Sequence, residues 1–472
     1  MSEPSPPRTR EELWDRIRQT SREEIILEEM IRLGFWPAQG ELPQDPADEI
    51  RRRGEIHREL RELKREDRRL QDEKILRKQM LEKRLAESRR KQQETKERRE
   101  RERQERSAAW EQRRQQEILY LGEGVSGGLN QTEGLSDRLQ QHRLPLCLTA
   151  EQLATAMGLT IAALRFLAFA RRTSPTSHYV RFQIPKKTGG LRLISAPMPR
   201  LKQVQYWILD NILDRLTPHD AAHGFCRGRS IVTNALPHLG ADVVINLDLQ
   251  DFFPTISYRR VKGLFRSFGY SEAVATILAL LCTEPEVETV DLDGQTYYVA
   301  LTDRRLPQGA PTSPTIANLI CRRLDRRLTE MATTLGFTYT RYADDLTFSG
   351  SGDALRQICN LLQRSVAILT HEGFTVHDQK TRVLRNSRQQ EVTGIVVNHK
   401  LNVDRETLKR FRAILYQIEK DGPAGKQWGH SRDLMASIHG FANYVAMVNP
   451  EKGQKLLAQV KRIKQKYKRK RR

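Results

Sequence analysis

The sequence predicts an α+β fold that follows a long, charged helical extension. Three regions of different composition support this prediction. Residues 1–140 are rich in charge, residues 141–350 mix helical and strand patterns, and residues 351–472 are again largely helical. We take these ranges as candidate domains, and a chain of 472 residues is long enough to bury a substantial core.

The first region contains two helical patterns. Apolar residues recur at helical spacing over residues 10–33, which predicts an amphipathic helix ending near Gly34. Over residues 50–116 both charge signs interleave without proline, which favours one long solvated helix. The apolar positions keep no strict heptad, so a coiled coil, a helix that orders on RNA and a plain spacer all stay open. Four glycines in residues 122–128 predict a flexible joint.

The chain as a whole is strongly basic, with a formal net charge of +22. Such a surface suits a polyanion, and nucleic acid is the first candidate partner. Residues 461–472 are nearly all basic, which predicts either phosphate contacts or a solvated tail. The five cysteines lack metal-binding spacing and are expected to be reduced thiols. No apolar signal segment or membrane-length run is present, so we expect a cytoplasmic protein with no membrane partner.

Helix and strand signals alternate from residue 141 onward. Thr149, followed three residues later by Gln152, predicts a capping box that opens a helix. The glycine-containing segment 185–190 predicts the loop of a β-hairpin. The other predicted elements are the hairpin strands 179–184 and 191–194, a helix over 203–216, and strands over 243–249 and 392–397.

Two acidic segments carry the strongest functional signal. Residues 341–348 hold two short strand patterns around Asp344 and Asp345, which predicts a β-hairpin with both carboxylates at its tip. Taken alone, such a pair is an ordinary feature of turns. Asp248, however, ends an apolar strand, where an isolated charge is unfavourable unless it is paired or binds a cation.

If that strand lies beside the hairpin, Asp248 and Asp344 converge and can bridge two Mg²⁺ ions about 3.5–4 Å apart. Such a pair supports in-line nucleotidyl transfer, because one ion activates a primer hydroxyl and the other neutralises the leaving pyrophosphate. The loop residue Lys187 and Arg192 on the next strand could bind a triphosphate. Two further candidates for a nucleotide pocket are Phe253 and, on a Pro/Gly-rich turn, Gln308.

The order of these segments resembles the motif series of reverse transcriptases. The matching segments are Lys187 to Arg192, Asp248 to Phe253, residues 306–309, residues 342–345, and Gly373 to Lys380. Within that superfamily, which includes group II intron enzymes, residues 234–238 resemble the retron signature Asn-Ala-x-x-His. Residues 392–394 resemble the retron signature Val-Thr-Gly. The chain is thus similar to bacterial retron-type reverse transcriptases from about residue 145 to its end.

The resemblance implies a right-hand polymerase with fingers, a split-βαβ palm and a helical thumb. It also implies a role for each matched residue. Two Mg²⁺ ions would be held by Asp248, Asp344, Asp345 and the Leu249 carbonyl, and Lys380 would act as general acid. The nucleotide would be bound by Lys187, Arg192 and Gln308, and Phe253 would exclude a ribose 2′-hydroxyl. RNA would be bound by Asn234, His238, Val392, Thr393 and Gly394.

A retron enzyme would use a structured non-coding RNA as template and primer, with deoxynucleoside triphosphates as substrates. It would start from an internal 2′-hydroxyl and leave branched RNA-linked DNA. The resemblance further implies anti-phage defence with an effector protein. Because no RNase H domain is recognisable, a host RNase H would trim the RNA. The N-terminal 140 residues depart from the pattern of compact retron enzymes, and their role stays open.

Three other functions remain possible at this point. A group II intron-like or diversity-generating reverse transcriptase would share the acidic residues but lack the two retron signatures. A non-catalytic RNA-binding scaffold could be built on an inactive polymerase, although the aspartates and Gln308 are all present. A purely structural coiled-coil protein would leave the C-terminal two thirds without a role.

Overall fold

The computed structural model describes residues 76–185, 189–429, 431 and 433–469 of the chain. Before residue 76 it describes only residues 9–11, 14, 26, 29, 30, 32–35, 56, 59, 60, 63 and 64. The predicted helix over 10–33 and the first part of the predicted long helix therefore lie largely outside the described residues. The predicted mixture of helices and strands is confirmed for the part that is described.

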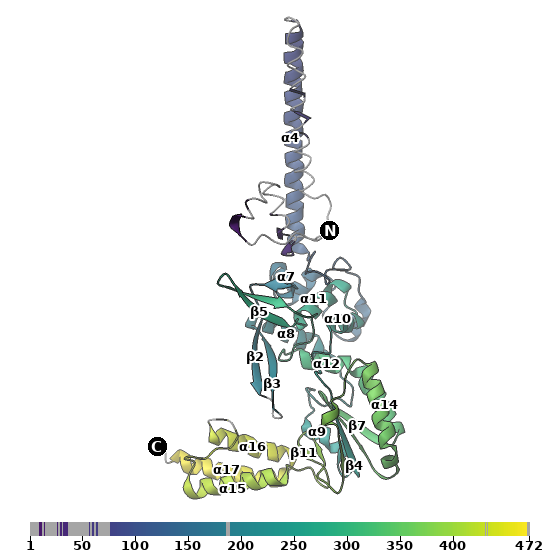
Figure 1. Cartoon of the computed structure of the whole chain (residues 1–472), viewed down its shortest axis with the longest axis vertical. Coiled ribbons are helices and arrows are strands. Elements are labelled where there is room, and N and C mark those ends of the chain that lie inside the picture. Colours follow the sequence, from purple (N-terminus) through teal and green to yellow (C-terminus); the bar gives the residue numbers. More distant parts are fainter. Residues whose placement is uncertain are drawn as a thin grey trace.

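A single long helix, α4 (Leu76–Gln116), projects from one end of the molecule (Figure 1). Most of its described side chains are exposed, and i,i+4 ion pairs such as Arg90–Glu94 run along it. Near its end it contacts α7 (Ile161–Ala168) of the body. The predicted long charged helix is thus confirmed over residues 76–116.

The glycine segment after α4 docks on the body, although we predicted a flexible joint there. The Ser126 hydroxyl donates to the Gly122 carbonyl over 2.6 Å, and Ala170 N donates to Leu121 O over 2.7 Å. At Gly122, with φ of +120°, a Cβ atom would lie 2.1 Å from the Ala170 carbonyl oxygen. Glycine is therefore required at residue 122 by close backbone packing.

The body below α4 combines helices with two small sheets. Thr149 and Gln152 form the predicted capping box at α6 (Ala150–Ala156). The predicted hairpin is confirmed as β2 (Tyr179–Pro185) and β3 (Leu191–Pro197). The remaining elements are α5 (Ser136–Gln141), α8 (Pro199–Asn211), η1 (Leu213–Arg215), α10 (Tyr258–Ser267), the fully buried α11 (Glu272–Cys282), and the sheet of β1 (Thr173–Ser174), β6 (Gln295–Ala300) and β5 (Val287–Leu292).

A four-stranded antiparallel sheet forms the next part of the molecule. Its strand order is β7 (Phe337–Tyr342), β8 (Asp345–Gly350), β4 (Val243–Asp248) and β9 (Arg382–Arg385). The helices that accompany the sheet are α12 (Ser313–Ile320), α13 (Arg322–Thr334) and α14 (Ile358–His371), with η3 (Gly352–Gln357) before α14. The predicted strand over 243–249 and the hairpin over 341–348 are both present.

The two faces of this sheet differ in chemistry. Side chains alternate between faces, and the register puts Leu247 and Phe348 on one face and Asp248 and Asp345 on the other. The first face is buried and packs against α13, where Tyr339 donates a hydrogen bond to Asp325. The second face carries the acidic residues at one end of the sheet.

The C-terminal part is a three-helix bundle with a hydrophobic core of its own (Figure 1). It comprises α15 (Arg405–Asp421), α16 (Leu434–Val448) and α17 (Pro450–Arg469). The predicted basic tail is thus the end of a packed helix, because Val460 and Ile463 are buried and Tyr467 donates to the Ile418 carbonyl over 2.9 Å. Residues 470–472 lie outside the described part of the chain.

The single strand predicted over 392–397 is wrong. Residues there form a tight hairpin of β10 (Glu391–Val392) and β11 (Ile395–Val396). Thr393 and Gly394 both have positive φ, of +46° and +83°, as a type I′ turn requires.

Within the described residues, no helix is long and apolar enough to cross a membrane.

Candidate active site

The pairing of β4 with β8 brings the two acidic segments together. Asp248 is the register partner of Asp345, so both side chains leave the same face of the sheet. Just beyond this pair, Leu249 N donates to Asp344 O over 3.0 Å. Asp344 itself lies in the turn between β7 and β8, directly after Ala343. The structure therefore brings the three predicted aspartates to one end of the sheet.

The local field at this end favours binding of a cation. Burial raises the pKa of Asp344, and the neighbouring Asp248 raises it further, while Arg192 and Lys380 oppose the rise. For Asp345, burial followed by the charges of Asp344 and Asp248 raises the pKa to about 7. Acidic groups that resist ionisation in this way gain from a cation that neutralises their repulsion.

Lys380 already places a cation beside one of these carboxylates. It ends the short turn η4 (Asp378–Lys380), and its Nζ donates to Asp248 Oδ2 over 2.8 Å. The turn is held close because His377 N donates to the Asp248 carbonyl over 2.8 Å. The lysine ammonium thus occupies a position at Asp248 that a metal cation could take.

The donors present at this site are those that a hard divalent ion prefers. Carboxylates and a backbone carbonyl bind Mg²⁺ well, and Leu249 supplies the carbonyl. Gln250 N bonds to Thr375 O and His377 N bonds to Asp248 O, so the strand alternation points the Leu249 peptide groups toward the hairpin. Among the described residues, however, no three acidic, His or Cys side chains are already gathered at metal-binding distance. An ion would have to draw the carboxylates together and displace Lys380 from Asp248.

The structure gives positions to three of the four predicted nucleotide-binding residues. Arg192 is exposed on β3 and acts electrostatically on Asp344. Phe253 is half-buried and packs edge-on against Phe252, with their ring centroids 5.3 Å apart. Lys187 lies outside the described residues, so its predicted role in nucleotide binding stays a prediction.

The turn that carries Gln308 is attached directly to the β2–β3 hairpin. Ser195 N donates to the Gln308 carbonyl over 2.8 Å. Gly309 follows with φ of +124°, and a Cβ atom there would lie 2.8 Å from the Ser195 carbonyl oxygen. Glycine is required at this close approach, which fixes Gln308 between the hairpin and α12.

Comparison with known proteins agrees with this geometry. Residues 184–397 match the family model described as reverse transcriptase (RNA-dependent DNA polymerase). The chain is 45% identical over 326 residues to the retron Mx162 reverse transcriptase of Myxococcus xanthus, covering 66% of each protein. It is 43% identical to the retron Mx65 reverse transcriptase of the same organism, covering 68% of this chain and 73% of that protein. It is also 30% identical to the retron Ec86 reverse transcriptase of Escherichia coli, covering 70% of this chain and 94% of that protein.

The chain belongs to the retron reverse transcriptases. The predicted family is therefore confirmed, and with it the enzyme class, RNA-directed DNA polymerase. A divalent cation is implied in general by a domain of this class.

The first retron signature is buried, which corrects the predicted direct contact of its side chains with RNA. Asn234, in α9 (Ile231–Ala235), and His238, in η2 (Leu236–His238), are both fully buried. His238 Nδ1 is 2.7 Å from the Ser349 hydroxyl, and Nε2 is 2.7 Å from the Thr340 hydroxyl. His238 therefore ties β7 to β8 from the polar face of the sheet, and it has no surface to offer a ligand.

The second retron signature lies against the first. Val392 is fully buried in the core of the C-terminal bundle, so it too cannot contact RNA directly. The hairpin contacts α9, and Tyr444 of α16 donates to the Gly394 carbonyl over 3.1 Å. Thr393 is partly buried at the turn. The two signatures together form the junction between the four-stranded sheet and the C-terminal bundle.

Arg341 and Asp325 were not singled out as candidate site residues from the sequence. Both are fully buried behind the β7–β8 hairpin and form an ion pair with each other. The available signal was the position of Arg341 inside a strand pattern, three residues before Asp344. A basic residue there is compatible with exposure as well as burial, so sequence alone does not identify its partner.

We expect His238→Ala to lower the free energy of unfolding by about 2–4 kcal/mol at pH 7.5, since it removes the partner of the buried Ser349 hydroxyl and one of two partners of Thr340, and leaves a cavity. Burial lowers the pKa of His238 to about 3, below its unfolded value. The wild type therefore loses this stability as pH falls below about 6.5, and the difference from the variant should shrink there. Denaturant unfolding at pH 7.5 and 5 measures both effects, with the exposed His399→Ala as control. A loss below about 0.5 kcal/mol at pH 7.5 would show that the buried histidine contributes nothing.

Proposed function

We propose that this chain copies a structured non-coding RNA into DNA, and that it does so with two Mg²⁺ ions at the end of β4 and β8. The observation that carries the proposal is the register pairing of Asp248 with Asp345, together with the Leu249 N to Asp344 O bond. This pairing puts three carboxylates at one open end of a rigid sheet, as nucleotidyl transfer by two metals requires.

When bound, the ions would activate the primer hydroxyl and neutralise the triphosphate as pyrophosphate leaves. Asp248, Asp344, Asp345 and the Leu249 carbonyl would hold them. Lys380 is 2.8 Å from Asp248, and once displaced by a metal ion it would donate a proton to the departing pyrophosphate. Arg192 on β3 would bind the triphosphate together with Lys187, and Gln308 would line the nucleotide pocket.

The architecture supports the proposed right-hand arrangement. The body with the β2–β3 hairpin would be the fingers, and the four-stranded sheet with its helices the palm. The bundle of α15, α16 and α17 would be the thumb, attached through the two retron signatures. Because Asn234, His238 and Val392 are buried, they would shape the RNA path by holding thumb to palm. Thr393 and Gly394, at the tip of the hairpin, keep the proposed contact with RNA.

Membership in the retron family supports the finer parts of the proposal. The RNA would serve as both template and primer, synthesis would start from an internal 2′-hydroxyl, and the product would be branched RNA-linked DNA. A host RNase H would trim the RNA, and an effector protein would act with the complex in anti-phage defence in the bacterial cytoplasm. The strongly basic charge of the chain suits this nucleic-acid partner.

We expect Asp344→Asn to reduce primer extension on poly(rA)·oligo(dT) with Mg²⁺ by at least about 1,000-fold, because it removes a charged metal ligand at the reacting centre. Incorporation of labelled dTTP measures the effect, with the thermal unfolding temperature as a control for folding. Equal activity in both proteins would contradict the proposal, and so would absence of activity in both on RNA templates of several kinds.

A second experiment addresses the retron product directly. The chain should be purified from its native host and the co-purifying nucleic acid sequenced after protease treatment. RNA covalently joined to DNA would support initiation from a 2′-hydroxyl. RNA alone, with active wild-type protein, would favour a group II intron-like or diversity-generating enzyme.

We expect Phe253→Ala to let the enzyme use ribonucleotides at least about tenfold better relative to deoxynucleotides, since removal of the ring opens space for a 2′-hydroxyl. The ratio of UTP to dTTP incorporation on poly(rA)·oligo(dT) measures this, with Phe253→Tyr as a control that keeps the ring. An unchanged ratio in the alanine variant would show that Phe253 does not line the sugar pocket.

A further inference from the structure

A buried ion pair lies directly behind the hairpin that carries Asp344. Arg341 on β7 and Asp325 on α13 are both fully buried. Arg341 Nε donates to Asp325 Oδ1 and Nη2 donates to Oδ2, each over 2.7 Å. Tyr339 also donates to Asp325 Oδ1, over 2.9 Å. The ion pair is bidentate and closed off from solvent, which fixes the guanidinium firmly.

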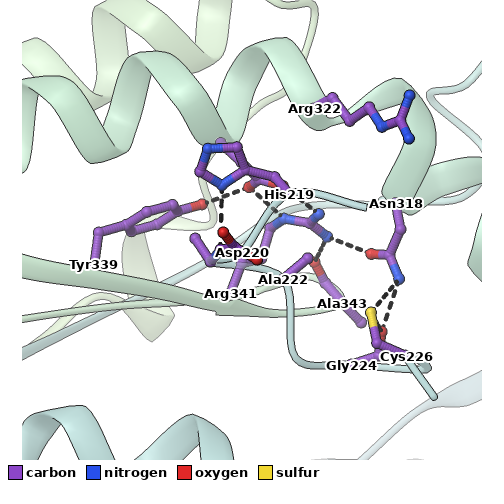
Figure 2. Close-up of polar contacts among 12 residues, drawn as sticks. His219, Asp220, Ala222, Gly224, Cys226, Asn318, Arg322, Tyr339, Arg341 and Ala343 are labelled. Carbon is purple, nitrogen blue, oxygen red and sulfur yellow. Dashed lines mark hydrogen bonds and ion pairs between the residues drawn. The ribbon is translucent and has the colours of Figure 1, made fainter. Parts of the chain in front are cut away.

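The remaining Arg341 nitrogen reaches the turn itself. Nη1 donates to the Ala343 carbonyl over 3.1 Å and to Asn318 Oδ1 over 3.0 Å, as Figure 2 shows. Ala343 has φ of +57°, a left-handed conformation that is unfavourable for alanine. The carbonyl held by Arg341 belongs to the peptide that joins Ala343 to Asp344. The orientation of that peptide sets the direction in which the Asp344 side chain leaves the turn.

The same network also fixes the other side of the turn. Asn318 Nδ2 donates to the Gly224 carbonyl over 2.7 Å (Figure 2). A Cβ atom on Gly224 would lie 2.7 Å from Ala343 N, so the two backbones touch. The preceding residues pair with β7, because Arg341 N donates to Ala221 O and His223 N donates to Arg341 O. Ala343 is therefore confined from both sides.

Arg341 contacts the second acidic segment as well. Its guanidinium carbon is 6.0 Å from the ring centroid of Phe252, which follows Asp248 and Leu249 along the chain. Phe252 in turn packs against Phe253 and Phe374. One side chain thus touches both segments that supply the proposed metal ligands, from the face of the sheet opposite the carboxylates.

Stability alone gives no reason for a charged pair at this position. Well-packed apolar residues often replace a buried ion pair with no loss of stability. Only a guanidinium can bind a carboxylate through two bonds and still donate to a carbonyl and an amide oxygen, because it has five N–H groups in a rigid plane. The hydrogen bond from Arg341 Nη1 to the Ala343 carbonyl therefore explains why this position holds arginine.

We infer that Arg341, held by Asp325, is a positioning residue that sets the geometry of the metal-binding aspartates through the Ala343 carbonyl. The inference rests on the proposed function in so far as Asp248 and Asp344 bind divalent metal. In other metal sites, residues that hydrogen-bond to the metal ligands hold those ligands in place, and their loss weakens metal binding by about 10–100-fold. We assign this role to the buried ion pair of Arg341 and Asp325.

Two variants of the full chain test this inference. Arg341→Lys keeps the charge but cannot make the bidentate bond and reach Ala343 as well. The triple variant Arg341→Met, Asp325→Leu, Tyr339→Phe removes the network without leaving a charge or hydroxyl unpaired. Mn²⁺ binding, measured by electron paramagnetic resonance, should weaken about 10–100-fold in both. The half-saturating Mg²⁺ concentration in primer extension should rise by a similar factor.

A matched ion pair on the same helix supplies the control. Arg327 on α13 bonds to Glu372 over 2.6 Å, and Arg323 of the same helix also pairs with this carboxylate. The variant Arg327→Met, Glu372→Gln should bind Mn²⁺ as the wild type does. The thermal unfolding temperature of every variant identifies those that are folded. Should the triple variant not fold, Arg341→Lys alone decides.

Folded Arg341→Lys protein that binds Mn²⁺ within about twofold of wild type would overturn the inference, and so would equal weakening in the Arg327 control. The proposed function fails separately. If wild type binds Mn²⁺ but extends no primer, the proposed two-metal copying of RNA fails, while the Mn²⁺ results still test the inference about Arg341. If wild type is active and the variants bind Mn²⁺ normally, only the inference about Arg341 fails.

Discussion

The antiparallel pairing of β4 with β8 is the constraint on which the rest of the site depends. It places Asp248 opposite Asp345 and, one residue further, ties Leu249 to Asp344. A slip of one residue would send the side chain of Asp248 to the buried face that packs on α13. The register is fixed because the opposite face carries large apolar residues such as Leu247 and Phe348, which are buried only in this alignment.

This pairing also brings carboxylates that repel one another close together, and the surrounding residues offset this repulsion only in part. Burial and mutual repulsion raise the pKa of Asp344 and Asp345, and Lys380 relieves some of the repulsion through Asp248. A divalent cation would relieve more of it, which is the physical basis for a metal at this end of the sheet. The backbone segments that carry the carboxylates must nevertheless be held in place before a metal ion can draw the side chains together. Behind the hairpin, Arg341 and Asp325 form a rigid contact that is able to hold them.

The sequence predicted those parts of the fold and the site whose signal is local. A charged residue at the end of an apolar strand and an Asp-Asp pair between two strand patterns identified the acidic segments. The capping box at Thr149 and the β2–β3 hairpin were also local signals, and both are present. The confirmed family came from the order of several such motifs along the chain.

Burial and partner choice could not be predicted in this way. His238 looks polar in sequence, but tertiary packing places it between two hydroxyls inside the protein. The β-branched residues 392–397 suggested one strand, although the positive φ at Gly394 divides them into a hairpin. The basic residues of α17 predicted a tail, but the helix also carries an apolar stripe, which includes the buried Val460 and Ile463. For His238 and α17 the deciding contacts come from residues distant in sequence, and no local pattern reports them.

The most direct test of the account is the anomalous scattering of Mn²⁺ in crystals of the full chain. We expect Mn²⁺ within about 2.0–2.6 Å of carboxylate oxygens of both Asp248 and Asp344, with the Leu249 carbonyl as a further ligand. Mn²⁺ bound only elsewhere, or the Asp248 and Asp344 side chains facing solvent far apart, would contradict it.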